Sequence, residues 1–319
     1  MDAFLIMLRN VILFAALAVP GYLLVRCGIL KQEQSGVISK ILMYVGMPFL
    51  ILSGTVNNLT LGGELLVQLL IVLALGVAYT LAMFFASLPL CASEKEHKTN
   101  GMMRFCAVFS NNGFLGIPLA VAVFGKSSGV FVVLVILNIV TNVMMYTLGA
   151  YLISGDKSSI SLKKAFLNPI LIAFLVGIVL NLLNVKQYVP EISTYSDHFS
   201  GIVTPISMTI LGMKLATVRL STLFTSCKGY YVSALKLILF PAVIVGVLLA
   251  CRTLVGGVFN SDMVLGFFIA FAMPTAGLAS TFADNYGGDV ENAVVFTLGT
   301  TLLSILTIPT LFWLLSCFL

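Results

Sequence analysis

The stretch FSNNGFLGIP, residues 109–118, breaks the pattern of an apolar segment with glycines, asparagines and a proline. Pro118 has no backbone N–H, and its ring opposes the carbonyl four residues earlier. Gly113 and Gly116 permit unwound backbone without steric cost. In hydrocarbon, a peptide group freed in this way needs a partner, so unwound backbone persists only where it is buried in protein or faces a watery cavity. The stretch therefore predicts a helix that is interrupted in mid-membrane.

A second stretch, AMPTAGLAS at residues 272–280, interrupts a later apolar segment with the same ingredients. Asn111 and Asn112 place amides in the first break, and Pro274 with Thr275 places a hydroxyl in the second. If the two breaks cross near the midplane, their N-terminal helix ends offer unpaired amides and a positive dipole end to a carboxylate. The pair predicts a site for a small organic anion. The alternative is that both prolines only kink packed helices.

Composition places the chain in a membrane. Of its 319 residues, 60% are hydrophobic and 9% are charged, and the mean hydropathy is +1.10. A soluble domain is about 25% charged. The apolar residues fall in ten blocks of about the 20 residues that a helix needs to cross a bilayer. We therefore expect an all-α integral membrane protein with ten transmembrane helices. The expected spans are 4–26, 36–55, 65–90, 103–123, 128–153, 167–184, 199–218, 229–254, 263–283 and 291–317.

The ten segments divide into two related halves. Sliding the chain by 162 residues pairs Phe109 with Phe271 and Gly125 with Gly287, and the interrupted segment is the fourth of five in each half. Paired interrupted segments are a sequence signature of a transporter binding site. An odd number of helices per half inverts the second half, so the expected fold is a 5+5 inverted repeat with broken, crossing helices 4 and 9. The expected domains are residues 1–154, a short cytoplasmic linker at 155–166, and residues 167–319.

Basic residues set the expected orientation. Thirteen lie on the side of the odd-numbered connections and 4 on the other, which together make the 17 Lys and Arg residues. Lys214 and Lys236 lie inside expected spans, and without them the count is 11 against 4. Cytoplasmic loops retain Lys and Arg, so both termini should face the extracytoplasmic side of a cell (inner) membrane. The connection between the ninth and tenth segments breaks this rule, because it carries acidic residues alone.

Further polar residues are candidates for the lining of the same cavity. Asn138, Thr141 and Asn142 recur at helical spacing in the fifth segment, and the tenth segment has the polar residues Thr297, Thr300, Thr301 and Ser304. Such side chains equally serve as hydrogen-bonding contacts between membrane helices, so both roles remain open.

Ionisable residues within spans are candidates for coupling transport to an ion. We single out Lys214 and Asp284. Lys214 lies near the cytoplasmic end of its segment, from which it can reach the interface, and Asp284 begins a polar turn. A coupled proton or sodium ion is left open.

Other function classes find little support. The basic residues are spread over short connections, which argues against nucleic acid. Neither His97 nor His198 has a nucleophile or a metal ligand at a recognisable spacing, and the six cysteines show no metal-binding or redox motif. We expect no enzyme activity, no cofactor and no metal.

Five motifs taken together resemble the auxin efflux carrier family, which includes bacterial malate and malonate permease-like members. The motifs cover the whole chain and are residues 111–119 (NNGFLGIPL), 47–49 (MPF), 211–215 (LGMKL), 286–289 (YGGD) and 304–309 (SILTIP). The resemblance implies a ten-helix inverted repeat, crossing fourth and ninth helices, elevator-like alternating access and often a homodimer. It also implies a polar residue at each crossover, here Asn112 and the Pro274–Thr275 pair.

The expected function is that of a secondary transporter, or permease, for a small organic anion such as a mono- or dicarboxylate. Two alternatives are a gated anion channel and an efflux carrier for an auxin-like aromatic carboxylate. Residues 154–166 are shorter than the long cytoplasmic loop of plant carriers, which disfavours auxin itself. A dicarboxylate calls for a fixed positive charge, and no arginine lies near either crossover, so substrate identity is open.

Overall fold

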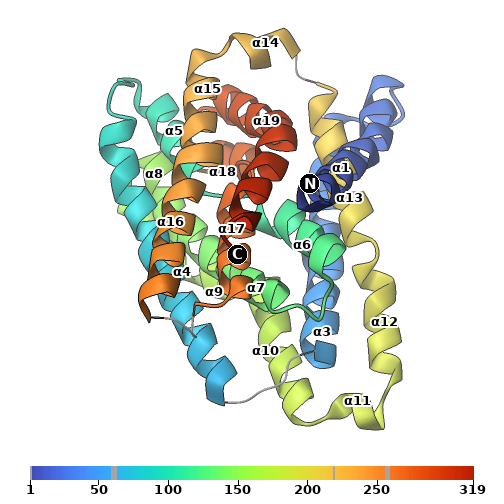
Figure 1. Cartoon of the computed structure of the whole chain (residues 1–319). Helices are drawn as coiled ribbons and strands as arrows, with labels where there is room; N and C mark the ends of the chain where they lie inside the picture. Colours follow the sequence, from blue (N-terminus) through green and yellow to red (C-terminus); the bar gives the residue numbers. More distant parts are fainter. Residues whose placement is uncertain (1, 59–62, 218–219, 256–258) are drawn as a thin grey trace.

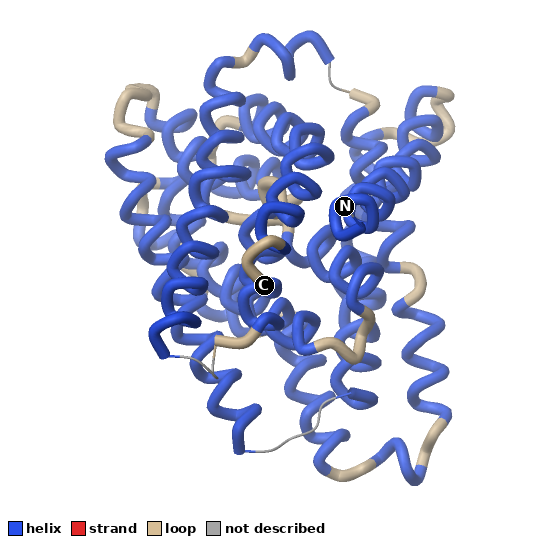
Figure 2. Tube along the Cα trace, in the orientation of Figure 1, coloured by secondary structure: helices blue, strands red, loops and turns tan. Residues whose placement is uncertain are grey.

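The computed structural model describes residues 2–58, 63–217, 220–255 and 259–319. Within these ranges the chain is helical throughout, and the only β structure is one isolated bridge between Ser110 and Thr275 (Figure 2). The all-helical class expected from the hydropathy pattern is confirmed.

The elements of residues 1–154 include three π-helical turns within longer helices. They are α1 (Asp2–Arg26), η1 (Gln32–Gln34), α2 (Ser35–Ile41), η2 (Leu42–Gly46), α3 (Met47–Asn58), α4 (Gly63–Leu90), α5 (His97–Val108), η3 (Asn112–Gly116), α6 (Ile117–Phe124), α7 (Gly129–Met144), η4 (Met145–Gly149) and α8 (Ala150–Ser154).

The rest of the chain begins with two short helices in the stretch expected to be a linker. The elements are η5 (Lys157–Ser159), α9 (Leu162–Phe166), α10 (Pro169–Leu182), α11 (Val185–Tyr188), α12 (Glu191–Ser200), α13 (Val203–Leu215), α14 (Leu220–Thr225), α15 (Cys227–Ala234), η6 (Leu235–Leu239), α16 (Phe240–Val255), α17 (Ser261–Ala272), α18 (Ala279–Tyr286) and α19 (Val290–Ser316).

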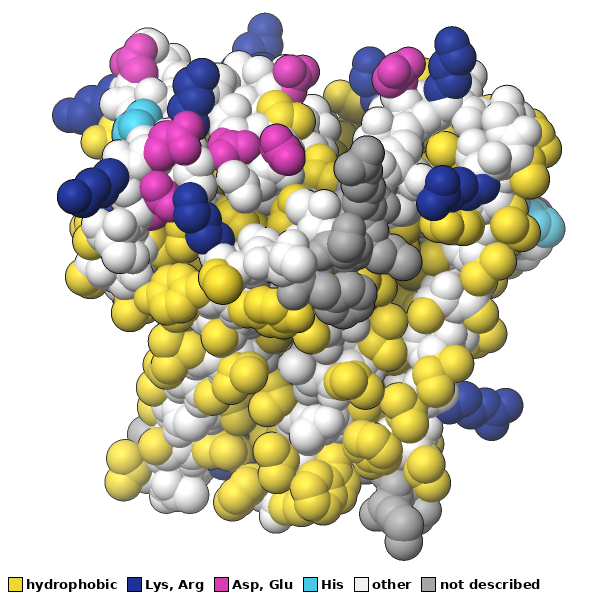
Figure 3. Space-filling view, turned by 90° about the horizontal axis from the view of Figure 1, so that it is seen from above, with side chains coloured by type: hydrophobic (Ala, Val, Ile, Leu, Met, Phe, Trp, Pro, Cys, Tyr) yellow, Lys and Arg dark blue, Asp and Glu magenta, His cyan; other side chains and the backbone are white. Residues whose placement is uncertain are grey.

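Within the described residues, seven helical stretches are long and apolar enough to cross a membrane. Two shorter apolar helices, Asn112–Phe124 and Ser261–Ala272, belong to the interrupted segments. The outer faces are apolar: on α10, Leu175, Val179 and Leu182 each expose more than half of their surface. Figure 3 shows charged side chains gathered along one edge of the molecule and hydrophobic ones over the remainder. Such an exposed apolar surface is stable only in contact with lipid.

The helices form two groups, which lie on opposite sides in Figure 1. In the first, α1 packs on α13, and α3 packs on α10 and α12. In the second, α7 packs on α4 and α17, and α19 packs on α15 and α18. We call these the outer group and the inner group. Small residues bring α1 and α13 together, because a Cβ at Gly212 would overlap the backbone of Ala18. The inner group contains both interrupted helices.

The interrupted helices have matching pieces. Before the break, α5 and α17 each contain 12 residues; after it, α6 and α18 each contain 8. Gly125 ends α6 with a φ of 83°, and Gly287 ends α18 with a φ of 72°. These backbone angles favour glycine, since it has no Cβ to clash. The two segments that the sequence aligns thus share these features, and they differ in that the π-helical turn η3 runs directly into α6.

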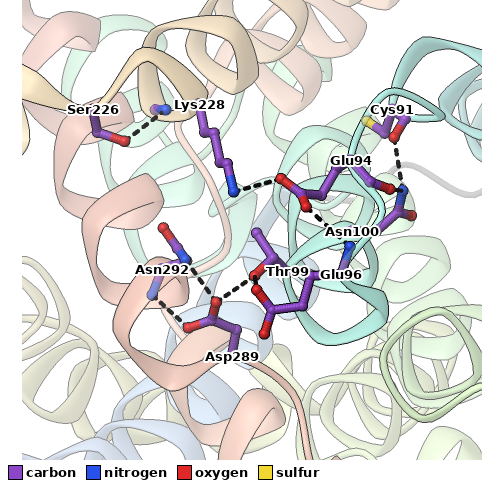
Figure 4. Close-up of polar contacts among 10 residues, drawn as sticks. Cys91, Glu94, Glu96, Thr99, Asn100, Ser226, Lys228, Asp289 and Asn292 are labelled. Atoms are coloured by element: carbon purple, nitrogen blue, oxygen red, sulfur yellow. Dashed lines mark hydrogen bonds and ion pairs between the residues drawn. The ribbon is translucent and has the colours of Figure 1, made fainter.

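A polar cluster joins the ends of several inner-group helices (Figure 4). Lys228, in α15, forms an ion pair of 2.5 Å with Glu94 in the connection before α5. Its hydrogen bond to Glu94 is the main cause that lowers the pKa of that carboxyl. Asp289 accepts hydrogen bonds from Thr99 at 2.7 Å and from the backbone N–H of Asn292 at 3.0 Å. One acidic residue of the connection that broke the charge rule thus has a structural role, because Asp289 caps α19 and accepts a hydrogen bond from Thr99.

A second ion pair links the two groups. The ammonium of Lys126, in the loop after α6, lies 2.6 Å from a carboxylate oxygen of Asp197 in α12. It also donates to Ser53 of α3 at 3.3 Å and to Ser200 at 2.9 Å. The loop that follows the first interrupted helix is thus held to the outer group.

Replacing Asp289 by alanine should destabilise the protein by about 1 kcal/mol, the typical cost of losing a helix N-cap. Partial burial acts to raise the pKa of Asp289, but hydrogen bonds from Asn292 and Thr99 outweigh it and lower that pKa. Because the folded pKa is depressed, the stabilisation is present above the unfolded value of about 3.9 and is lost as pH falls through the folded pKa.

The measurement is the thermal unfolding midpoint of purified protein at neutral pH and below about pH 4. Asp289→Ala should lower the midpoint at neutral pH, and the difference from the unmodified protein should shrink in acid. Asp289→Asn retains an acceptor for the cap and serves as the control. Equal midpoints for Asp289→Ala and the unmodified protein at neutral pH would contradict the assignment.

Candidate functional site

The two breaks are paired with each other by backbone hydrogen bonds. The N–H of Asn111 donates to the carbonyl of Pro274 at 2.7 Å, and the N–H of Ala276 donates to the carbonyl of Phe109 at 2.9 Å. These two bonds flank the bridge between Ser110 and Thr275. Peptide groups that neither helix can satisfy are therefore satisfied across the junction, as a low-dielectric interior requires. We call residues 109–116 and 273–278 the paired breaks.

Hydroxyl groups hold the second break in place. The Thr275 hydroxyl donates to the carbonyl of Cys106 at 2.8 Å, and the Thr275 N–H donates to the hydroxyl of Thr300 at 3.1 Å. Thr275 is fully buried. Because Cys106 belongs to α5 and Thr300 to α19, this one residue connects three helices.

An amide network supports the first break. Asn138 donates from its side chain to the side-chain oxygen of Asn112 at 2.8 Å, and the Asn112 amide donates to the Thr141 hydroxyl at 2.8 Å. Asn142 donates to Asn138 at 2.8 and 3.1 Å. Gly113 leaves room for this network, since a Cβ there would lie 2.8 Å from the Asn138 amide nitrogen and would displace it. The spacing of three and four residues on α7 thus directs three polar side chains at the start of η3.

A cavity of about 40 Å³ lies beside the paired breaks. It is large enough for a few water molecules, so a larger guest requires the lining to move apart. Its lining is Met43, Ser110, Asn111, Asn112, Gly113, Phe114, Asn138, Thr141, Asn142, Met145, Ile170, Ala276, Gly277 and Leu278. Met43 and Ile170 come from η2 and α10 of the outer group, so the cavity lies between the groups.

Two lysines contact residues that line this cavity, one from each group. Lys236, in η6, is fully buried and donates to the Ser110 hydroxyl. Lys214, in the last turn of α13, donates to the carbonyl of Gly277 at 2.6 Å. In the part of the chain that the structure describes, neither ammonium has a carboxylate partner. Desolvated cations without a counter-ion are costly, and their charge favours an anion in the cavity.

The structure brings together many of the residues singled out from the sequence. Asn111, Asn112, Gly113, Asn138 and Asn142 line the cavity. The remaining residues of the breaks have structural positions outside the lining. Gly116 packs against Met273, Pro118 lies in the first turn of α6, and Pro274 supplies a carbonyl to the pairing.

Two further residues singled out from the sequence lie outside the cavity lining. Ser304 is buried, but its hydroxyl donates to the Thr301 carbonyl of its own helix at 2.7 Å, and it does not line the cavity. The residue of α19 that reaches the paired breaks is Thr300, one turn earlier. Asp284 is exposed near the end of α18 and is not part of the lining, because that helix carries it away from the breaks.

Lys236 was missed as a site residue. The expectation that Lys214 and Asp284 are the ionisable residues of interest within spans was wrong in omitting it. The signal was present in the sequence, since a lysine inside an apolar span is by default functional. The orientation count already placed Lys236 inside an expected span, but the residue was not carried over to the candidates for coupling.

Comparison with known proteins matches this chain to a family described as membrane transport protein, once over residues 5–162 and again over 156–313. An "Uncharacterized transporter" of Methanothermobacter thermautotrophicus is 28% identical over 308 residues, covering 94% of this chain and 96% of that protein. A "Putative malonate transporter" of Rhizobium meliloti is 24% identical over 315 residues, covering 94% and 93%. The family resemblance noted in the sequence is confirmed.

Replacing Thr275 by valine should destabilise the paired breaks with little change in side-chain volume. The Cys106 carbonyl then loses its hydroxyl donor, at a cost of about 1 kcal/mol for a hydrogen bond between membrane helices. Thr275→Ser keeps the hydroxyl and is the matched control. The measurement is the thermal unfolding midpoint in detergent, and the account fails at this point if valine and serine give the same midpoint.

Proposed function

This chain belongs to the membrane transport protein family, and we propose that it is a secondary transporter of a small organic anion, such as a mono- or dicarboxylate. It is a multi-pass membrane protein, with several helices long and apolar enough to cross the bilayer. The proposed site is the cavity beside the paired breaks, and the proposed mechanism is alternating access around it.

The observation that carries the proposal is the charge around the cavity. The lining is apolar and amide-rich, without a carboxylate, while Lys236 and Lys214 contact it through Ser110 and Gly277. Two positive charges held near a neutral cavity in a low-dielectric region attract a negative guest strongly. The same arrangement disfavours a cationic or neutral substrate.

Helix ends add to this preference. The turn formed by η3 begins at Asn112 and continues into α6, so its N-terminal end opens at the cavity. Unpaired N–H groups and the helix dipole favour an anion at such an end. Within the described residues, the side-chain amide of Asn111 has no hydrogen-bond partner and lines the cavity. It is the group we propose to donate to a substrate carboxylate, with Asn112 and Asn138 holding it in position.

We further propose that the fold is a 5+5 inverted repeat of ten transmembrane helices, with repeats at 1–154 and 167–319. Three observations support it. The family model matches twice. The interrupted helices have pieces of equal length. In the outer group α1 packs on α13 while α10 packs on α3, so each half contributes one helix to each pair.

Alternating access would follow from movement of the inner group against the outer group. The cavity lies between them, with most of its lining in the inner group. Moving the inner group carries the paired breaks, and with them the anion, relative to Met43 and Ile170. We place both termini outside and the protein in the cell membrane, on the charge count of the connections.

The substrate we propose to examine first is malonate, because the Rhizobium meliloti relative carries that name. Two lysines at the cavity suit an anion with two carboxylates. They supply the positive charge that a dicarboxylate calls for and that no arginine of the described residues provides near the crossovers. Pyruvate, with one carboxylate and the same number of carbons, is the comparison substrate.

In proteoliposomes loaded with unlabelled substrate, the protein should accumulate labelled malonate or pyruvate by counterflow. Replacing Asn112 by alanine should lower this uptake about tenfold, because Asn138 and Thr141 each lose their hydrogen-bond partner at the cavity. Uptake by a monodisperse, thermally stable Asn112→Ala protein equal to that of the unmodified protein would refute the proposed site.

The same preparation separates the carrier from its alternatives. A gated anion channel gives ohmic single-channel currents and no counterflow, and an aromatic carboxylate carrier exchanges indole-3-acetate in preference to malonate and pyruvate. Saturable counterflow of the short acids supports the proposal, and either other result replaces it.

A further inference from the structure

We infer that Lys214 is the residue that selects substrates with a second carboxylate. The inference rests on the proposed function and concerns a side chain outside the cavity lining. It begins from the partner that Lys214 has: a neutral carbonyl, that of Gly277, at 2.6 Å. A carboxylate oxygen carries a negative charge, so it attracts an ammonium more strongly than a neutral carbonyl does. A carboxylate that arrives within reach of Lys214 therefore displaces this carbonyl.

The reach is short enough. Gly277 lines the cavity, so the ammonium lies one peptide carbonyl from its edge. The side-chain amide nitrogen of Asn111 would be 3.4 Å from a Cβ at Gly277. The amide proposed to hold one carboxylate and the carbonyl that holds Lys214 are thus neighbours. An acid with two carboxylates a few bonds apart spans from Asn111 to Lys214, whereas a monocarboxylate occupies the first position alone.

Lys214 differs from Lys236 in its exposure and in the helix group to which it belongs. Lys236 is fully buried within the inner group and is bonded to Ser110 at the bridge itself. Lys214 is half-buried at the end of α13, in the outer group, and it reaches across to the second break. Its helix also packs against η3, which places α13 next to the first break in this conformation. We therefore assign attraction of any anion to Lys236 and recognition of a second charge to Lys214.

The test compares uptake efficiency, the maximal counterflow rate divided by KM, for malonate and for pyruvate. Lys214→Gln removes the charge and keeps a polar side chain of similar length. We expect both efficiencies to fall and the malonate-to-pyruvate ratio to fall about tenfold, since a charged hydrogen bond to the second carboxylate is lost for malonate alone. Lys214→Arg retains the charge and should restore most of the ratio.

Lys186→Gln removes a positive charge from an exposed position on α11 and is the matched control, expected to leave both efficiencies unchanged. An equal loss of malonate and pyruvate uptake in Lys214→Gln, or no loss of either, overturns the inference and leaves the proposed carrier intact. Absence of counterflow for both acids in the unmodified protein overturns the proposed function. If the uptake rate of pyruvate equals the background rate, the background rate is used for pyruvate when the malonate-to-pyruvate ratio is calculated.

Discussion

The structure depends on one constraint: in a low-dielectric interior, the peptide groups of an unwound helix must find hydrogen-bond partners. Here the backbone bonds from Asn111 to Pro274 and from Ala276 to Phe109 do so, each break supplying what the other lacks. An unpaired buried peptide group costs several kcal/mol in hydrocarbon, so neither interruption is stable alone. The need for pairing determines where the two interrupted helices cross. The cavity lies beside this crossing, where the first helix is interrupted before α6 begins.

The second determinant is charge. Two ammonium groups near an amide-lined cavity are expensive to bury, and the observed bonds from Lys236 to a hydroxyl and from Lys214 to a carbonyl offset only part of that cost. A bound carboxylate offsets more of this burial cost, so the cost of burying the two lysines favours substrate binding. Ion pairs elsewhere have a different role: Lys126 with Asp197 joins the two helix groups, and Lys228 with Glu94 joins helix ends.

The sequence predicted the helical class, the two breaks and the amides of α7, because glycine, proline and asparagine stand out in an apolar background. It could not predict the register of the pairing. The pieces after the breaks are related by 162 residues, while Ser110 faces Thr275 at a separation of 165, because the first break is longer. It also could not say which polar residue of the tenth segment reaches the breaks: Thr300 does, while Ser304 bonds within its own helix. Lys236 was placed inside an expected span by the orientation count, but its contact with Ser110 depends on tertiary packing that the sequence does not show.

Protection of residue 111 by substrate tests most directly whether the paired breaks hold the anion. In Asn111→Cys protein, the rate at which a membrane-impermeant thiol reagent modifies that position is followed by mass spectrometry of the peptide, which separates it from the six native cysteines. Malonate or pyruvate should slow modification at 111 with a concentration dependence that matches transport by the Asn111→Cys protein itself, and should leave the exposed Cys227 unaffected. A modification rate at 111 that saturating substrate does not change would contradict the account.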